Sequence, residues 1–133
     1  MILLDTHVFV WLARDDAKLG RQARRRIEAE RTKGGVTLSA ASYTEVGTLV
    51  ERGRLRLSEP LQSLRARTLE AGIKELVIDA PIAMLASQLR GFHGDPIDRI
   101  LVATAMEHEA VLVTADEIIL GWGAGLRSFD ARR

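Results

Sequence analysis

The sequence contains no cysteine, which excludes disulfides, thiolate nucleophiles, cysteine-ligated zinc and iron–sulfur clusters. It also has little net charge, because nineteen Lys and Arg against eighteen Asp and Glu leave only +1, so no strong overall field indicates a nucleic-acid or membrane partner. Prolines number only three, and 47% of the residues are hydrophobic, which is typical of an ordered globular chain. The chemistry that remains is that of carboxylates, histidines and hydroxyl groups.

A long uninterrupted hydrophobic run is also absent. The two longest apolar stretches, residues 1–13 and 110–126, are interrupted by Asp5 and by Asp116 with Glu117, and no basic segment precedes the first stretch. We therefore expect a cytoplasmic protein that does not enter a membrane. The length of 133 residues predicts a single domain, residues 1–133, with one functional site.

Short apolar runs alternate with longer amphipathic segments along the chain. The runs predict strands at 2–4, 36–38, 76–78 and 111–113, with a weaker fifth candidate at 126–129. Helical spacing of apolar residues lies between them, as in Leu19, Ala23 and Ile27. Strands joined by helical crossovers predict an α/β fold with a parallel sheet.

Several acidic residues follow the predicted strands. Asp5 comes directly after the first strand and Asp116 shortly after the fourth, while Glu45 and Asp98 lie near the starts of two helices. The carboxyl ends of parallel strands share one edge of a sheet, so these four acids can meet there although Asp5 and Asp116 are far apart in the chain. Four clustered carboxylates repel one another unless cations are present or some of the groups are protonated.

A divalent metal is the simplest solution to this repulsion. Mg²⁺ and Mn²⁺ prefer oxygen ligands, and Mg²⁺ commonly binds through one or two carboxylates while keeping water for a phosphate substrate to displace. Two such ions about 3.5 to 4 Å apart can activate water and stabilise the leaving oxygen during phosphodiester cleavage. Phosphodiester hydrolysis is therefore our first hypothesis for the function.

Four segments together resemble a known family. They are Leu3–His7, Ser39–Glu45, Asp95–Arg99 and Val113–Asp116, and in this order they resemble the PIN domain, more narrowly the VapC toxins of prokaryotic toxin–antitoxin pairs. The resemblance implies a three-layer α/β/α sandwich with a four- to five-stranded parallel sheet in the order 3-2-1-4-5. It also implies an endoribonuclease that depends on Mg²⁺ or Mn²⁺, is neutralised by a small VapB-like antitoxin and forms a homodimer.

The resemblance also assigns site residues. It matches Asp5, Glu45 and Asp98 to metal-binding carboxylates and Asp116 to a fourth, more variable acid. Four further residues are candidate accessory residues. Thr114 matches the hydroxyl residue of the family's fourth segment, and Asp95 is a further acid. Arg99 can hold a carboxylate or a substrate phosphate, and Thr6 is a second residue able to cap the first helix.

Most of these acids also have a local structural explanation. Asp5 can cap the helix that begins near Thr6, and Asp98 and Asp95 can interact with a helix dipole as first-turn acids. Ser42–Glu45 reads as a capping box, in which the glutamate reaches back to a backbone N–H. Asp79 follows a predicted strand but precedes Ala80–Pro81, so a capping role is sufficient and we exclude it from the site. The three histidines fit no zinc motif, and structural or surface roles are expected for them.

Two other classes of function remain open. A phosphatase or phosphotransferase could use Asp5 as a nucleophile and form an aspartyl phosphate. The dehalogenase-like version of that chemistry places a second aspartate two positions on, where this sequence has His7. A non-enzymatic α/β module that binds a partner could carry the same acids as helix caps.

Overall fold

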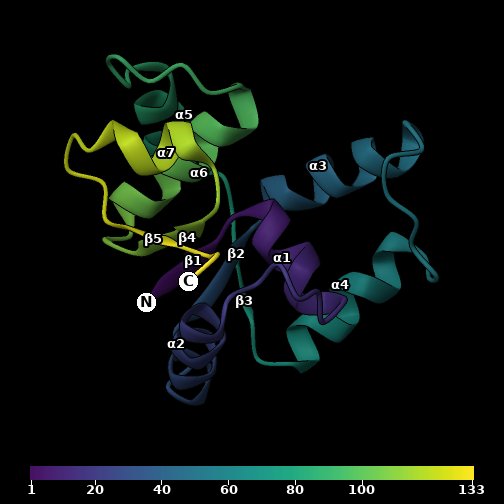
Figure 1. The fold of residues 1–133 in the computed structure, drawn as a ribbon. Helices are drawn as coiled ribbons and strands as arrows, with labels where there is room; N and C mark the ends of the chain where they lie inside the picture. The colour runs from purple at the N-terminus through teal and green to yellow at the C-terminus, as the bar shows by residue number, and fades with distance from the viewer.

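The computed structural model describes residues 1–133 and contains one five-stranded sheet (Figure 1). All neighbouring strands pair in parallel, in the order β3-β2-β1-β4-β5. This order confirms the predicted parallel sheet and its topology. The strands are β1 (Ile2–Leu4), β2 (Val36–Ser39), β3 (Lys74–Leu76), β4 (Val111–Thr114) and β5 (Ser128–Asp130).

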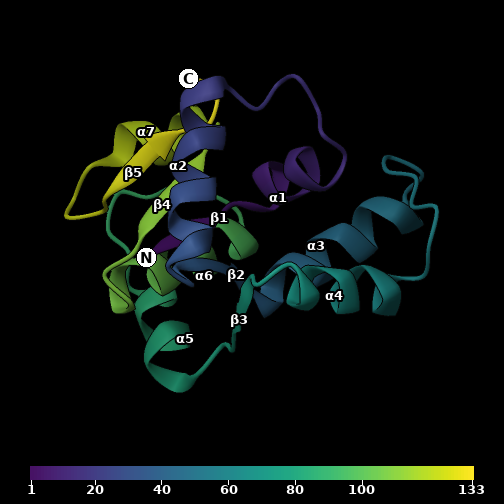
Figure 2. The same cartoon turned by 90° about the horizontal axis from the view of Figure 1, so that it is seen from below.

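Helices cover both faces of the sheet, as Figures 1 and 2 show. They are α1 (Thr6–Ala13), α2 (Arg21–Thr32), α3 (Ala40–Glu51), α4 (Leu61–Glu70), α5 (Ala80–Ser87), α6 (Pro96–Glu107) and α7 (Glu117–Trp122). Ile2 and Leu4 of β1 pack with apolar residues of α1 to α4, whereas Leu3 packs against the layer of α5, α6 and α7. The predicted three-layer sandwich is therefore confirmed. No helix combines the length and the apolar character needed to cross a bilayer.

Aspartates begin four of the seven helices. Asp5, Asp79, Asp95 and Asp116 are the N-cap residues of α1, α5, α6 and α7, and each side chain accepts a hydrogen bond from a backbone N–H of its helix. The predicted capping role of Asp79 is confirmed, because its Oδ1 accepts from the Ile82 N–H at 3.1 Å. Since Asp5 and Asp116 cap helices that follow β1 and β4, their carboxylates are fixed at the carboxyl edge of the sheet.

Two strands differ from their predicted positions. The third was predicted at 76–78 but lies at Lys74–Leu76, and the fifth was predicted at 126–129 but lies at Ser128–Asp130. Both form the outer edges of the sheet, where a strand is not required to be apolar throughout. Val77 and Ile78, the residues that suggested the third strand, are 68% and 42% exposed in the connection to α5.

Candidate metal centre

Asp5 lies at the base of the centre and is only 2% exposed. Its Oδ1 accepts a hydrogen bond from the Thr6 N–H at 2.7 Å, and its Oδ2 accepts from the Thr114 hydroxyl at 2.6 Å. Burial raises the pKa of Asp5 above its ordinary value, and nearby Asp116 raises it further, while Thr114 and His7 partly oppose the shift. The carboxyl group is thus held in one orientation in surroundings that penalise its charge.

Glu45 enters the centre from α3, and the predicted capping box is wrong. The helix begins earlier than expected: Ser39 is its N-cap and accepts from the Ala41 N–H, so Glu45 lies well inside the helix. One carboxylate oxygen, Oε1, is buried and has no hydrogen-bond partner. Burial raises the pKa of Glu45, and the charge of Asp5 adds to the shift, whereas the nearby Thr6 side chain lowers it. An unpartnered buried carboxylate oxygen is costly for a protein alone and suits a cation ligand.

Asp95 and Asp98 approach the centre from the start of α6. They form a capping box, in which Asp95 Oδ1 accepts from the Asp98 N–H at 2.8 Å and Asp98 Oδ2 accepts from the Asp95 N–H at 3.4 Å. Burial raises the pKa of Asp98 to about 7, and the charges of Asp95, Asp5 and Asp116 contribute to the increase. The same side chain therefore caps a helix and adds to a concentration of negative charge.

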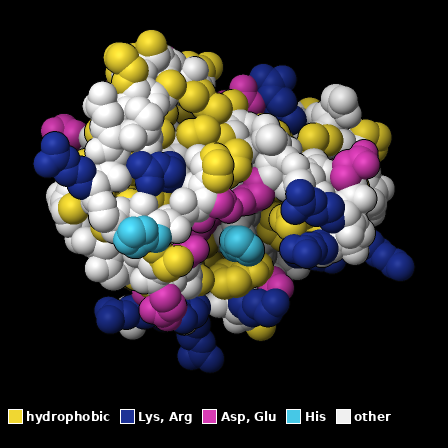
Figure 3. All heavy atoms as spheres, turned by 90° about the horizontal axis from the view of Figure 1, so that it is seen from above, with side chains coloured by type: hydrophobic (Ala, Val, Ile, Leu, Met, Phe, Trp, Pro, Cys, Tyr) yellow, Lys and Arg dark blue, Asp and Glu magenta, His cyan; other side chains and the backbone are white.

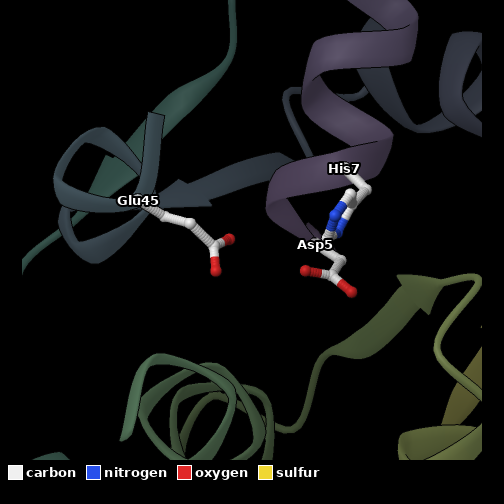
Figure 4. A group of neighbouring side chains, drawn as sticks. All are labelled: Asp5, His7 and Glu45. Atoms are coloured by element: carbon white, nitrogen blue, oxygen red, sulfur yellow. The ribbon is translucent and has the colours of Figure 1, made fainter. Parts of the chain in front are cut away.

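These side chains form two groups that share Glu45. Oxygen or nitrogen atoms of Asp5, His7 and Glu45 lie within 4.8 Å of one another, as do oxygens of Glu45, Asp95 and Asp98. Figure 4 shows the carboxyl groups of Glu45 and Asp5 converging from α3 and the start of α1, with the His7 ring beside Asp5. Figure 3 shows acidic side chains gathered near the middle of one face, with a histidine close by. Sequence reasoning did not assign His7 to the site, although its position two residues after Asp5 was the available signal.

Asp116 and Thr114 border the two groups. The Thr114 hydroxyl donates to Asp5 and accepts from the Asp116 N–H at 3.0 Å, and Asp116 Oδ1 accepts from the N–H groups of Ile118 and Ile119. Asp116 is near enough to raise the pKa values of Asp5 and Asp98, but it belongs to neither group of potential metal ligands. Thr6, buried at 0% exposure, donates its hydroxyl hydrogen to Ser42 Oγ at 3.0 Å and so links α1 to α3.

Arg99 holds no carboxylate in the structure, and its predicted contact with a substrate phosphate stays a prediction. Its guanidinium donates to the backbone carbonyls of Ala86, Phe92 and Leu89 at 2.7 to 3.1 Å. These bonds satisfy the last carbonyls of α5 and the loop that follows it. Arg99 therefore stabilises the connection between α5 and α6, on which the start of α6 depends.

The donor set suits a divalent cation. Three carboxyl groups with raised pKa values, Asp5, Glu45 and Asp98, come from three separate segments, and a positive ion between them would offset both their repulsion and their burial. The orphaned Oε1 of Glu45 gives such an ion an immediate ligand. The acidic residues can therefore bind a metal, mainly through oxygen atoms.

A parallel sheet in the order β3-β2-β1-β4-β5 with an acidic centre at its carboxyl edge defines a class of open α/β proteins that bind their ligands at that edge, beside the central strand. The PIN domain family model matches residues 2–120, and the chain belongs to this family. It is 34% identical over 119 residues to Ribonuclease VapC22 of Mycobacterium tuberculosis (strain ATCC 25618 / H37Rv), an alignment that covers 86% of each protein.

Solved structures share the fold at lower sequence identity. VapBC2 from Rickettsia felis, bound to a DNA fragment from its promoter, matches with a TM-score of 0.73 and 18% identity over 97% of this chain and 98% of that one. DNA-bound VapBC from Salmonella typhimurium gives a TM-score of 0.71 and 18% identity over 98% of each chain. At these identities the matches establish the fold.

Proposed function

We propose that this protein is a divalent-metal-dependent endoribonuclease that acts as the toxin of a toxin–antitoxin pair. The observation that carries the proposal is the position of Glu45 in α3, whose carboxylate belongs both to the group with Asp5, the residue after β1, and to the group with Asp98 of α6, and whose buried Oε1 is unpartnered. Similarity to Ribonuclease VapC22 over most of the chain supports RNA as the substrate.

In this proposal Asp5, Glu45 and Asp98 hold Mg²⁺ or Mn²⁺, Asp95 is a further ligand beside Asp98, and Asp116 adds negative charge at the margin. A bound divalent ion would polarise water for attack on the phosphodiester and stabilise the charge that develops on the phosphate oxygens. The protein residues supply the placement of the ligands, and a bound cation would offset the burial and the repulsion that raise their pKa values.

Thr114 and Thr6 are positioning residues in this account. Thr114 fixes Asp5 Oδ2 through a bond of 2.6 Å, which leaves the carboxyl group little freedom to rotate away from Glu45. Thr6 supplies its backbone N–H to Asp5 and its hydroxyl to Ser42 of α3. Together they join the segments that carry Asp5 and Glu45, as the outer hydrogen bonds of metal sites generally do.

We extend the proposal to partners and organisation. The matched structures are described as VapBC assemblies, which supports a small VapB-like antitoxin as the partner of this chain. We further propose that residues 1–133 work as one nuclease domain, that the protein forms a homodimer, and that it acts in the cytoplasm, where an RNA substrate is found.

The two rival functions are less well supported. A nucleophilic aspartate must expose an oxygen to an incoming phosphate, but Asp5 is 2% exposed and both of its oxygens accept hydrogen bonds. If the acids of a partner-binding module served only as helix caps, Glu45 would lie at the start of a helix. It lies inside α3 instead. Neither reading accounts for its buried, unpartnered oxygen.

Cleavage of total RNA by purified protein tests the proposal. We expect cleavage with Mg²⁺ or Mn²⁺, none in chelator, and recovery when metal is added back. Asp5→Asn should abolish cleavage, whereas Asp79→Asn should retain it, because Asp79 caps α5 away from the centre and asparagine caps helices equally well. Cleavage that persists after thorough chelation, or an active Asp5→Asn variant beside an inactive Asp79→Asn variant, would overturn it.

A further inference from the structure

His7 gives one of the two potential metal-binding groups a different chemistry from the other. Both groups contain Glu45, but one is completed by Asp5 and His7 and the other by Asp95 and Asp98. The first therefore offers a ring nitrogen beside two carboxylates, and the second offers carboxylate oxygens alone. The two groups are not equivalent as cation sites.

We propose that His7 is a metal ligand that makes the group of Asp5, His7 and Glu45 select a first-row transition-metal ion over Mg²⁺. This inference rests on the proposed function, because it assumes that the acidic centre binds a divalent cation. It goes beyond that function by assigning a residue that determines which ion the centre takes.

The local structure holds His7 where a ligand is needed. Asp5 caps α1 and is tied by Thr114, so the first turn of the helix, which carries His7, has a fixed position relative to the Asp5 carboxylate. His7 is exposed, whereas its neighbours Thr6 and Val8 are fully buried. The side chain thus lies at the open side of the centre, beside Asp5 (Figure 4).

The electrostatics agree with this placement. A positive charge on the His7 ring lowers the pKa values of both Asp5 and Glu45, so the ring is near both carboxyl groups and not only near its sequence neighbour. The buried Oε1 of Glu45 has no protein partner. A cation held by His7, Asp5 and Glu45 would provide one.

Ligand chemistry predicts the selectivity. Mg²⁺ is a hard cation that favours oxygen ligands and retains water, whereas imidazole nitrogen is a preferred ligand of first-row transition ions. Affinity for mixed nitrogen and oxygen sites rises from Mn²⁺ to Co²⁺. Removing the nitrogen should therefore weaken Co²⁺ binding most, Mn²⁺ binding less and Mg²⁺ binding least.

Calorimetric titration of untagged, metal-free protein with MgCl₂, MnCl₂ and CoCl₂ tests the inference. The variants are His7→Ala, the matched control His108→Ala, and Asp5→Asn. His108 is also exposed, but it is the C-cap of α6, about 15 Å along the helix from Asp98. Circular dichroism of each variant checks the fold, and the visible absorption of bound Co²⁺ reports whether a nitrogen ligand is lost.

We expect wild-type protein to bind Co²⁺ at least about tenfold more tightly than Mg²⁺. His7→Ala should lose about 10- to 100-fold in Co²⁺ affinity and change the Co²⁺ spectrum, with Mg²⁺ affinity little altered, while His108→Ala should match wild type. An unchanged ratio of Co²⁺ to Mg²⁺ affinity in His7→Ala would overturn the inference. If Asp5→Asn nevertheless abolished binding of all three ions, the proposed metal centre would survive that failure. If wild-type protein bound none of them, both would fail.

Discussion

At the scale of single residues, the centre is defined by carboxyl groups placed where their charge is unfavourable. Burial is the largest cause of the raised pKa values of Asp5, Glu45 and Asp98, and repulsion from at least one neighbouring acid adds to each. Without a cation, ionisation of these groups opposes folding, because the same groups are well hydrated and separated in the unfolded chain. A divalent ion reverses this effect, which is why the metal-free and metal-bound proteins should respond differently to pH.

The pH dependence of metal-free stability follows from Asp98. Its pKa of about 7 in the folded protein exceeds the ordinary value of 3.8, so the folded state holds the proton more tightly than the unfolded chain does. This contribution to stability is fully present below about pH 4 and is lost as the pH rises through 7. We expect the melting temperature in chelator to fall between pH 5 and pH 8, and Asp98→Asn to make that fall smaller. A melting temperature that rises with pH, or an identical slope in Asp98→Asn, would contradict this assignment.

The positioning role of Thr114 can be tested with valine, which keeps the shape and removes the hydroxyl. Thr114→Val deprives Asp5 of a donor and the Asp116 N–H of an acceptor, so we expect a loss of about 1 to 3 kcal/mol in unfolding free energy. Metal affinity should also fall by about tenfold. Thr104→Val is the control, because Thr104 is buried but bonds only the Ile100 carbonyl within α6. Equal metal affinities in the two variants would show that Thr114 has only a structural role.

The acidic residues of the centre could be predicted from the sequence more reliably than the contacts that each of them makes. Asp5 was predicted because an ionisable residue directly after a buried strand is unusual, and it is buried as that argument implies. The sequence left two roles open for Glu45, because the segment Ser42–Glu45 matches the pattern of a capping box. Only the start of the helix at Ala40 excludes the capping role. His7 was expected to have a structural or surface role, because its proximity to Glu45, which lies 38 residues further along the chain, is not visible in the sequence.

At the scale of elements, residues that begin helices have two roles: they cap the helix and they carry carboxylates at the acidic centre. Asp5, Asp95 and Asp116 each cap a helix, and each also faces the acidic centre or its margin. Capping bonds restrict these carboxylates before any metal arrives, so the centre requires little rearrangement. Glu45 is the exception, because it comes from the interior of α3 and its orientation depends on how that helix packs.

The start of α3 gives a prediction for element stability. Ser39→Ala removes the side chain that accepts from the Ala41 N–H and should cost about 0.5 to 2 kcal/mol of unfolding free energy. Thr44→Ala, on the exposed side of the same helix, should cost much less. Denaturant unfolding of the two variants measures the difference. Equal costs would mean that Ser39 is not the effective cap.

Element boundaries were predictable where the sequence carries capping signals and not where it lacks them. Asp79 with Pro81 and Asp95 with Pro96 mark the starts of α5 and α6 correctly. The edge strand β3 has no such signal, because Lys74 and Glu75 break the apolar pattern while exposed Val77 extends it beyond the strand. Pairing with β2, not hydrophobicity, determines where β3 lies.

At the scale of the whole molecule, topology creates the centre. The β1 strand lies between β2 and β4, so the segments that follow these three strands carry Asp5, Glu45 and Asp116 to one edge of the sheet. This could be predicted, because parallel strands always present their carboxyl ends together. The separation into two groups that share Glu45 could not, since it depends on side-chain directions set by packing between α3 and α6.

A metal that binds only the folded protein must stabilise the whole molecule. At a free metal concentration one hundred times the dissociation constant, stabilisation of about 2.7 kcal/mol is expected. Mn²⁺ should therefore raise the melting temperature of wild-type protein in a concentration-dependent way, whereas Asp5→Asn should respond weakly and start from an equal or higher metal-free value. A larger response in Asp5→Asn than in wild type would exclude Asp5 as a ligand.

The central claim is that one acidic centre both binds the metal and cuts RNA. Its most direct test measures RNA cleavage and Mn²⁺ binding over the same range of free metal, with wild-type protein and Glu45→Gln. The account predicts that cleavage and binding rise together in wild type, and that both shift by at least about tenfold in Glu45→Gln while the fold is retained. Wild-type cleavage and metal affinity in Glu45→Gln, or full cleavage at metal concentrations too low for binding, would contradict it.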